Sequence, residues 1–206
     1  MTEEVLRRRD GWRVETIDFY VATALVREFH YSGSTANTAT ERHGLISPSG
    51  DVVGAALWIP PTKNAALSVS ENWQGVLCNS RLAVHPDCPK NAASFLLGRS
   101  MSLIDRERWP TFLTYADSNQ GHTGAIYRAT NWTYVGVTPA GDVWTHSVTG
   151  EQRGRKRGPR TWLSSEMIEA GYVKNPPGVK HKFVHRSSAR PKAKSVKYFQ
   201  GEIDWN

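Results

Sequence analysis

The chain of 206 residues is 39% hydrophobic and carries a net charge of +7, which fits one α/β domain with a basic appended segment. No stretch reaches the roughly 18 consecutive apolar residues of a membrane-spanning helix, and the first residues lack the apolar segment of a signal peptide. The 2 cysteines, Cys78 and Cys88, form no CxxC pair, which excludes a disulfide framework and a cysteine-based zinc site. We therefore expect a cytoplasmic protein that does not associate with membranes.

The first predicted elements are a helix and a hairpin. Apolar residues at helical spacing predict a helix over 16–28, with Thr16 as its cap. The segments 43–47 and 52–59, joined by a turn at 48–51, predict a β-hairpin. A pair of prolines ends the second strand, because proline cannot donate to a strand ladder.

Strands and helices alternate in the middle of the chain. Residues 76–84 predict a central strand, and Asn91 is placed to cap a helix over 92–107. A strand over 112–116 and a short helix near 123–130 follow. The pattern ends with two more strands, 132–137 and 143–148. This order predicts an α/β fold in which helices flank a mixed sheet.

The positive charge is concentrated in the last quarter of the chain. Residues 1–150 hold 13 Lys and Arg against 14 Asp and Glu, whereas residues 151–206 hold 13 against 5. We therefore predict a domain over 1–150 and a basic C-terminal extension over 151–206. Because Lys and Arg release counterions from phosphates, and because aromatic residues interleave with them, we expect this extension to contact nucleic acid. A solubilising tail is the alternative. The candidate contacts are Arg153, Arg155, Lys156, Arg157, Arg160, Lys180 and Lys182.

A strand, loop and helix over 81–101 form a candidate cofactor site. The N-terminus of a helix offers unpaired N–H groups and a positive dipole end, which together bind phosphate. Lys90 adds a charge and Ser94 a hydroxyl, so the segment suits the pyrophosphate of coenzyme A. The loop lacks the glycines of known phosphate-binding motifs, and an ordinary capped helix is the alternative.

Three further positions are candidates for catalysis. Asp117 ends a predicted strand, where ligands bind in open α/β sheets, and it could deprotonate an amine together with His122. A loop cap and a surface histidine are the alternatives. Tyr127 could protonate a leaving thiolate or, alternatively, pack on the core. The pair His30 and Tyr31 follows the first helix, where it could face a cleft.

Residues 79–136 resemble the Mom family of phage DNA modification proteins. The resembling segments are Ser80-Arg81-Leu82, the helix start Pro89-Lys90-Asn91-Ala92-Ala93-Ser94, Tyr115-Ala116-Asp117, and the stretch GHTGAIYRATNW over 121–132. The last stretch is the most specific, and the His30-Tyr31 pair also fits the family. The similarity is looser over 16–150, and little matches in the C-terminal extension.

This resemblance implies a fold similar to that of the GNAT N-acetyltransferases, with a largely antiparallel sheet, and makes 1–150 the catalytic domain. It implies an enzyme that adds a carbamoylmethyl group to the exocyclic amine of adenine in phage DNA, which shields the DNA from restriction enzymes. Acetyl-CoA or a related acyl-CoA is the implied cofactor. Double-stranded DNA is the implied partner, the host cytoplasm the location, and a homodimer one expected assembly.

The resemblance also assigns roles to residues. The matching catalytic positions are Tyr31, Asp117 and Tyr127, with His30 beside them. The residues on the cofactor side are Arg81, Leu82, Val84, Lys90, Asn91 and Ser94. The segment 90–94 replaces the glycine-rich loop of ordinary acetyltransferases, a departure that Mom-type proteins share. An iron has been suggested for the family, but the spacing of His30, His122 and Asp117 does not point to a metal.

The chemistry on DNA sets a further requirement, because an amine inside a duplex must be extruded to reach a buried site. Trp132, Tyr134 or Tyr31 could stack on the extruded base. Two other functions remain open at this stage. One is conventional acetylation of a protein or small-molecule amine, and the other is non-catalytic DNA binding on the same scaffold.

Overall fold

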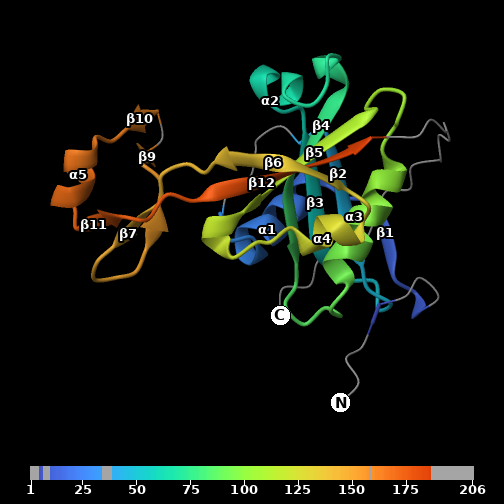
Figure 1. The fold of residues 1–206 in the computed structure, drawn as a ribbon. Helices are drawn as coiled ribbons and strands as arrows, with labels where there is room; N and C mark the ends of the chain where they lie inside the picture. Colours follow the sequence, from blue (N-terminus) through green and yellow to red (C-terminus); the bar gives the residue numbers. More distant parts are fainter. Residues whose placement is uncertain (1–4, 7–9, 34–38, 158, 187–206) are drawn as a thin grey trace. The chain divides into compact units, whose positions relative to one another are not determined.

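The computed structural model describes residues 5–6, 10–33, 39–157 and 159–186, without the side chain of Arg157. Its main feature is a seven-stranded sheet in the order β1-β2-β3-β4-β5-β12-β6 (Figure 1). The strands are β1 (Arg13–Thr16), β2 (Glu41–Ile46), β3 (Val52–Ile59), β4 (Val76–Val84), β5 (Thr111–Asp117), β6 (Thr133–Pro139) and β12 (Val179–Arg186). The pairs from β1 to β4 are antiparallel, and β4 pairs with β5 in parallel. The predicted mixed, largely antiparallel sheet is therefore confirmed.

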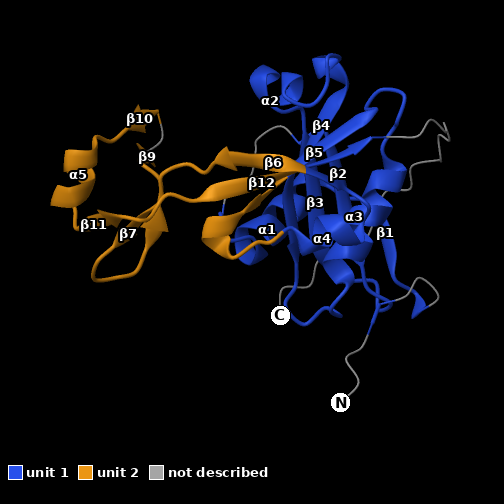
Figure 2. Ribbon diagram, in the orientation of Figure 1, with its two compact units in different colours: residues 1–114, 124–134, 183–206 blue, residues 115–123, 135–182 orange. Residues whose placement is uncertain are grey.

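The chain divides into two compact units (Figure 2). Unit 1 comprises Met1–Thr114, Gly124–Tyr134 and Phe183–Asn206, and unit 2 comprises Tyr115–Thr123 and Val135–Lys182. Three strands, β5, β6 and β12, each contribute residues to both units. The predicted boundary after residue 150 stays a prediction, but the extension supplies β12 to the large sheet.

The helices of unit 1 are α1 (Phe19–Phe29), α2 (Lys63–Leu67), α3 (Ala92–Leu103) and α4 (Ala125–Ala129), with the 3-10 turn η2 (Trp73–Gly75). α1 begins later than predicted: Asp18 caps it by accepting a hydrogen bond from the Tyr20 N–H at 2.7 Å. The predicted cap, Thr16, instead pairs with His43 in the β1–β2 ladder. Among the described residues, no helix is long and apolar enough to cross a membrane.

The core of unit 1 follows the two-residue alternation of its strands. Ile46 and Ala55 pack in one apolar cluster with Leu25 of α1, whereas their neighbours Leu45 and Ala56 pack with α3 in another. The sheet is therefore covered by α1 on one face and by α3 on the other.

Unit 2 has a small core of its own, formed by Trp144, Met167 and Tyr172. Its three-stranded sheet has the order β11-β7-β8, and a two-stranded hairpin and a helix complete it. These elements are β7 (Trp144–His146), β8 (Gln152–Arg153), β9 (Lys156–Arg157), β10 (Arg160–Thr161), α5 (Ser164–Glu169) and β11 (Tyr172–Lys174), with the 3-10 turn η3 (Ser118–Gln120) elsewhere in the unit. Much of the predicted basic extension is thus folded.

Candidate active site

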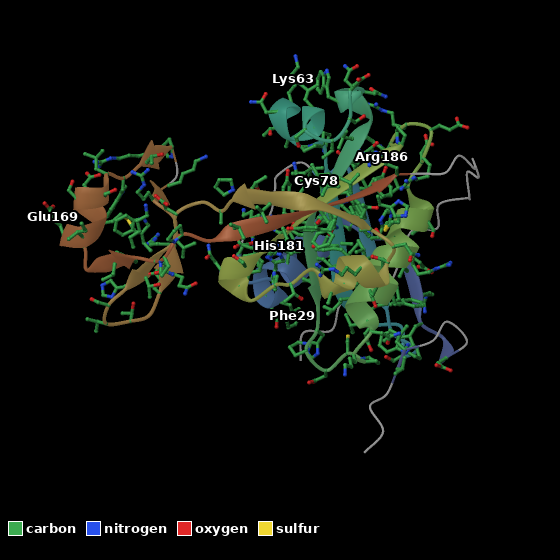
Figure 3. All side chains as sticks on the ribbon, viewed as in Figure 1. Phe29, Lys63, Cys78, Glu169, His181 and Arg186 are labelled. Carbon is green, nitrogen blue, oxygen red and sulfur yellow. The ribbon has the colours of Figure 1, made fainter. Side chains whose placement is uncertain are left out.

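The strands β4 and β5 separate soon after they begin. Their parallel ladder runs from the pair Val76–Thr111 to the pair Cys78–Leu113, whereas β4 continues to Val84. Cys78, labelled in Figure 3, is therefore the last residue of β4 in this ladder. Beyond it, β4 keeps its antiparallel ladder with β3 only.

A β-bulge explains why β4 leaves its neighbour. Trp58 of β3 pairs with Asn79, but Leu57 pairs with Arg81, so Ser80 is an extra residue in β4. Such a bulge bends the strand and increases its local twist. The Asn79 amide nitrogen donates to the carbonyls of Leu57 and Arg81 at 3.3 and 3.2 Å, which holds the bulge in place.

A threonine side chain links the two strands just beyond the end of their backbone ladder. The buried Thr114 hydroxyl of β5 donates to the Asn79 carbonyl at 3.2 Å. This bond satisfies a buried carbonyl, and it also brings a hydroxyl to the point where the two strands part.

Tyr127 of α4 lies at the same point and is hydrogen-bonded to Thr114. Burial raises the pKa of the Tyr127 phenol to about 12; the Thr114 bond opposes this rise, and the Cys78 and Tyr31 side chains add to it. The phenol therefore keeps its proton at neutral pH, as a general acid must. Its ring packs against Phe183 with a centroid separation of 5.3 Å.

Backbone geometry at the start of α4 holds this tyrosine in place. Gly124 has a φ of 79° and is buried, and a Cβ there would collide with the Phe183 ring. Glycine adopts this left-handed conformation without steric cost. A glycine is thus required for α4 to approach β12 so closely.

The pair His30 and Tyr31 follows α1, as predicted. The His30 Nδ1 is 2.9 Å from the Ser32 hydroxyl, and the His30 and Tyr31 rings lie 4.3 Å apart. Tyr31 is 53% exposed, so its ring is accessible to a ligand. Tyr31 and Tyr127, two of the predicted catalytic residues, interact electrostatically, because Tyr31 contributes to the raised pKa of Tyr127.

The start of α3 differs from its predicted geometry. Asn91 stands at the cap position, but its side chain makes no cap bond. Its amide instead clamps the Leu6 backbone, accepting from the N–H at 2.7 Å and donating to the carbonyl at 2.8 Å. The predicted capping role is wrong because this distant segment, far from Asn91 in sequence, takes the side chain.

The N–H groups at the start of α3 remain suited to an anion. The structure shows no acceptor among the described residues for the N–H groups of Ala93 and Ser94. The Ser94 hydroxyl donates to the Asn91 carbonyl at 2.9 Å, so it would have to rotate to serve a phosphate. Lys90 is exposed beside them. These groups fit the phosphates of a nucleotide cofactor.

The other predicted cofactor residues lie on β4 past the bulge. The Arg81 guanidinium donates to the Ser80 carbonyl at 2.6 Å. The side chains of Leu82 and Val84 pack against the apolar cluster under α3, so these two residues can offer a ligand only their backbone.

Asp117 ends β5 and belongs to unit 2. Its Oδ1 accepts from the Asn119 N–H at 3.0 Å, which caps η3, and its Oδ2 is 3.9 Å from the Lys180 ammonium. Asp117 therefore does cap the following loop, as the alternative interpretation expected. Lys180, which was predicted to contact DNA, is the ion-pair partner of this carboxylate. The His122 side chain is exposed, and the backbone N–H of His122 donates to the backbone carbonyl of Asp117 at 3.2 Å.

Several of the predicted DNA contacts are engaged within unit 2. Arg153 pairs with Glu151 at 3.2 Å, and Arg160 pairs with Glu166. The Arg155 guanidinium donates to the Trp162 carbonyl at 3.3 Å. Lys156 is exposed on the β9–β10 hairpin, Lys182 is half-buried, and the side chain of Arg157 lies outside the described residues.

The structure corrects one candidate and adds two. Trp132 is 5% exposed and packs against Trp58 and Phe112, so it cannot stack on an incoming base. Thr114 and Cys78 were not predicted, because nothing local in the sequence marks where two strands separate. In the described part of the chain, no group of three or more His, Cys, Asp or Glu side chains could hold a metal ion.

The mixed sheet, covered by α1 on one face and by α3 on the other, has a GNAT-type fold. The putative acetyltransferase yncA of Salmonella typhimurium, solved with its cofactor acetyl-CoA, has a TM-score of 0.52 at 11% identity over 89% of this chain and 99% of its own. The acetyltransferase of Bacillus subtilis, solved with CoA, also scores 0.52, at 8% identity over 85% and 99%.

The family follows from the sequence comparison. The model of the Mom protein family matches residues 11–195, so the chain belongs to this family. It is 26% identical over 159 residues to the methylcarbamoylase mom of Escherichia phage Mu. The match covers 71% of this chain and 65% of that relative's length.

Proposed function

We propose that the protein is a transferase that adds a carbamoylmethyl-type group to the exocyclic amine of adenine in phage DNA, which protects it from host restriction enzymes. Membership of the Mom family and the name of the phage Mu relative support this function. The observation that carries it is the position of the Tyr127 phenol, buried beside Thr114 where β4 and β5 part.

Acetyl-CoA or a related acyl-CoA would supply the two-carbon unit of the group as a thioester. An ammonia-level nitrogen donor that displaces coenzyme A, and a two-electron oxidant that allows the N–CH2 bond to the adenine amine to form, would complete the carbamoylmethyl group. The residues that fit it are Lys90 and the N–H groups of Ala93 and Ser94, which suit its phosphates, and the β4 backbone from Leu82 to Val84. Two structures of similar fold were solved with acetyl-CoA or CoA, which supports this cofactor.

The chain's own residues would divide the chemistry between them. The adenine amine is a poor nucleophile, because its lone pair is delocalised into the purine, and holding it in place can contribute about 7–11 kcal/mol. Asp117 would accept a proton from the amine, which requires its bond to Lys180 or Asn119 to yield. Tyr127 would protonate the leaving group. Backbone N–H groups of β4 would stabilise negative charge on the reacting carbonyl.

Double-stranded DNA is the proposed substrate, and extrusion of the base would cost a few kcal/mol. Tyr31 and Tyr134 are 53% and 45% exposed, so either ring could stack on the base. Lys156 and Arg157 of the β9–β10 hairpin would hold the phosphate backbone without reading sequence.

Mass analysis of nucleosides from cells that express the protein tests this function. We expect a heavier adenine nucleoside with the wild type and little of it with Asp117→Ala. DNA without modified adenine in the wild-type cells would contradict the proposal. Unchanged modification with Asp117→Ala would remove this carboxylate from the chemistry but leave the function in place.

The second candidate is a conventional N-acetyltransferase of a protein or small-molecule amine, which the fold favours. Such an enzyme would transfer acetyl groups to amines in the absence of DNA. Acetylation of amines by purified protein without nucleic acid, together with unmodified DNA in the cells, would favour this alternative.

A further inference from the structure

Unit 1 contains a pocket of about 480 Å³ at the C-terminal half of α3, a size common for small-molecule sites. It is lined by Gly98, Met101, Ser102, Arg106, Asn131 and His185, among others. Eight residues of helix separate Ser102 from Ser94, which is about 12 Å along the axis. The pocket is therefore distinct from the N–H groups at the start of α3.

Among the residues that line this pocket, Arg106 is the one with a permanent charge, and His185 would be charged only when protonated. Its guanidinium stacks on the Phe112 ring at 3.7 Å. The Nη2 atom lies 3.4 Å from both the Pro110 carbonyl and the His185 Nδ1. Stacking and these two contacts hold the cation at the pocket wall.

The charge of Arg106 has no counterion in the described part of the chain. No carboxylate there lies within ion-pair distance, and the Nε atom is buried without an acceptor. Burial lowers the pKa of this guanidinium to about 10, so it is still charged at neutral pH. A half-buried cation without a counterion is unfavourable, and an anion in the pocket would relieve this cost.

The neighbouring groups also suit an anion. Because a guanidinium can only donate, the His185 Nδ1 accepts from Arg106, and the neutral ring therefore carries its proton on Nε2. Asn131, whose side chain is an amide, also lines the pocket. The two acidic neighbours in sequence, Asp105 and Glu107, are exposed and do not line the pocket.

We propose that this pocket binds a small oxyanionic ligand, with its carboxylate or phosphate group on Arg106. Guanidinium groups match these anions in geometry and charge. The anion is either free or part of a larger molecule, which includes coenzyme A itself. The site rests on the geometry of unit 1 and does not depend on the proposed reaction.

The imidazole of His185 reports on the pocket. Burial, and then the charge of Arg106, lower its pKa, so an anion on Arg106 will raise it. We would follow the ring by NMR during titration with inorganic phosphate, acetate or coenzyme A at constant ionic strength, assigning the signal by its loss in His185→Gln. We expect a saturable rise of the His185 pKa with at least one of these anions.

Two variants and a control make the test specific. Arg106→Gln removes the cation, while Arg108→Gln removes a nearby charge that does not line the pocket. Gly98→Val places an isopropyl group on the pocket wall and narrows the pocket, and the structure tolerates a Cβ there, which would meet Thr130 at an ordinary 3.6 Å. We expect the response to persist in Arg108→Gln and to be lost in the other two variants.

The outcomes separate the ligand sources. A response to coenzyme A alone assigns the pocket to a phosphate of the cofactor, and a response to phosphate or acetate assigns it to a separate ligand. The proposal would be overturned if none of the anions gave a saturable rise of the His185 pKa in the wild type. It would also be overturned if Arg106→Gln and Gly98→Val both showed the same rise as the wild type.

Discussion

The hydroxyls of Tyr127 and Thr114 are hydrogen-bonded at the place where the β4–β5 ladder ends. Thr114 comes from β5 and Tyr127 from α4, so the bond ties the helix to the opening in the sheet. The proposed general acid and the opening between the two strands are thereby placed together.

The pKa of Tyr127 gives a first prediction. In an ultraviolet absorbance titration, we expect one of the 7 tyrosines to ionise near pH 12, and this transition to disappear in Tyr127→Phe. Because the folded protein holds this proton more tightly than the unfolded chain, the associated stability is lost as the pH rises from about 10 to about 12. Ionisation of all tyrosines near pH 10 would contradict this assignment.

Thr114 should matter for stability as well as for activity. Thr114→Val leaves the buried Asn79 carbonyl with only the weak Cys78 thiol donor at 3.7 Å, which we expect to cost about 1–3 kcal/mol in urea denaturation. Thr114→Ser keeps the hydroxyl and serves as the control, with a smaller loss. Equal stability of the valine variant and the wild type would show that the bond is unimportant.

A buried polar network predicts a pH dependence in the acid range. His43 and Trp58 both contact the Ser100 hydroxyl at 2.7 Å. Burial, and then Arg42, lower the pKa of His43 to about 4 from its ordinary 6.5. The unfolded chain therefore takes up this proton first, and stability falls as the pH drops from about 6.5 to about 4. We expect a flatter profile for His43→Gln, and the same slope in both proteins would refute the explanation.

Gly124 should not tolerate a side chain. Gly124→Ala combines a positive φ with a collision against Phe183, so we expect a loss of more than about 1 kcal/mol in thermal or urea denaturation. Gly141→Ala is the matched control, since no atom lies within 4 Å of a Cβ there. Similar losses in both variants would mean that close packing of α4 on β12 is not the cause.

The basic hairpin of unit 2 gives a prediction about DNA. Replacing Lys156 and Arg157 together with glutamine should weaken duplex binding and reduce the slope of log affinity against log salt by about 0.9 per lost phosphate contact. Lys174→Gln is the control, because Lys174 already pairs with Asp142 at 3.0 Å. An unchanged slope in the double variant would place the DNA contacts elsewhere.

Local patterns in the sequence were sufficient to predict α1, α3 and five of the seven strands of the large sheet, because the periodicity of apolar residues is a property of each segment alone. The position of β12 could not be predicted, since it depends on pairing with strands formed by distant residues. Its basic sequence favoured a DNA-contacting tail instead.

The same distinction holds for the candidate site. The types of Tyr127, Asp117 and Ser94 suggested chemistry, but their partners come from elsewhere in the chain. Asp117 meets Lys180, and Asn91 clamps Leu6, over separations that no local motif reveals. The bulge at Ser80 depends on strand register, which has no signal in a single segment.

The most direct test of the account is nucleoside mass spectrometry on DNA from cells that express the wild type, Tyr127→Phe or Tyr20→Phe. Tyr20 is 81% exposed on α1 and serves as the control. We predict modified adenine with the wild type and Tyr20→Phe, and at least about 100-fold less with Tyr127→Phe. Modified adenine at wild-type levels in Tyr127→Phe would contradict the role of this phenol as the proton donor.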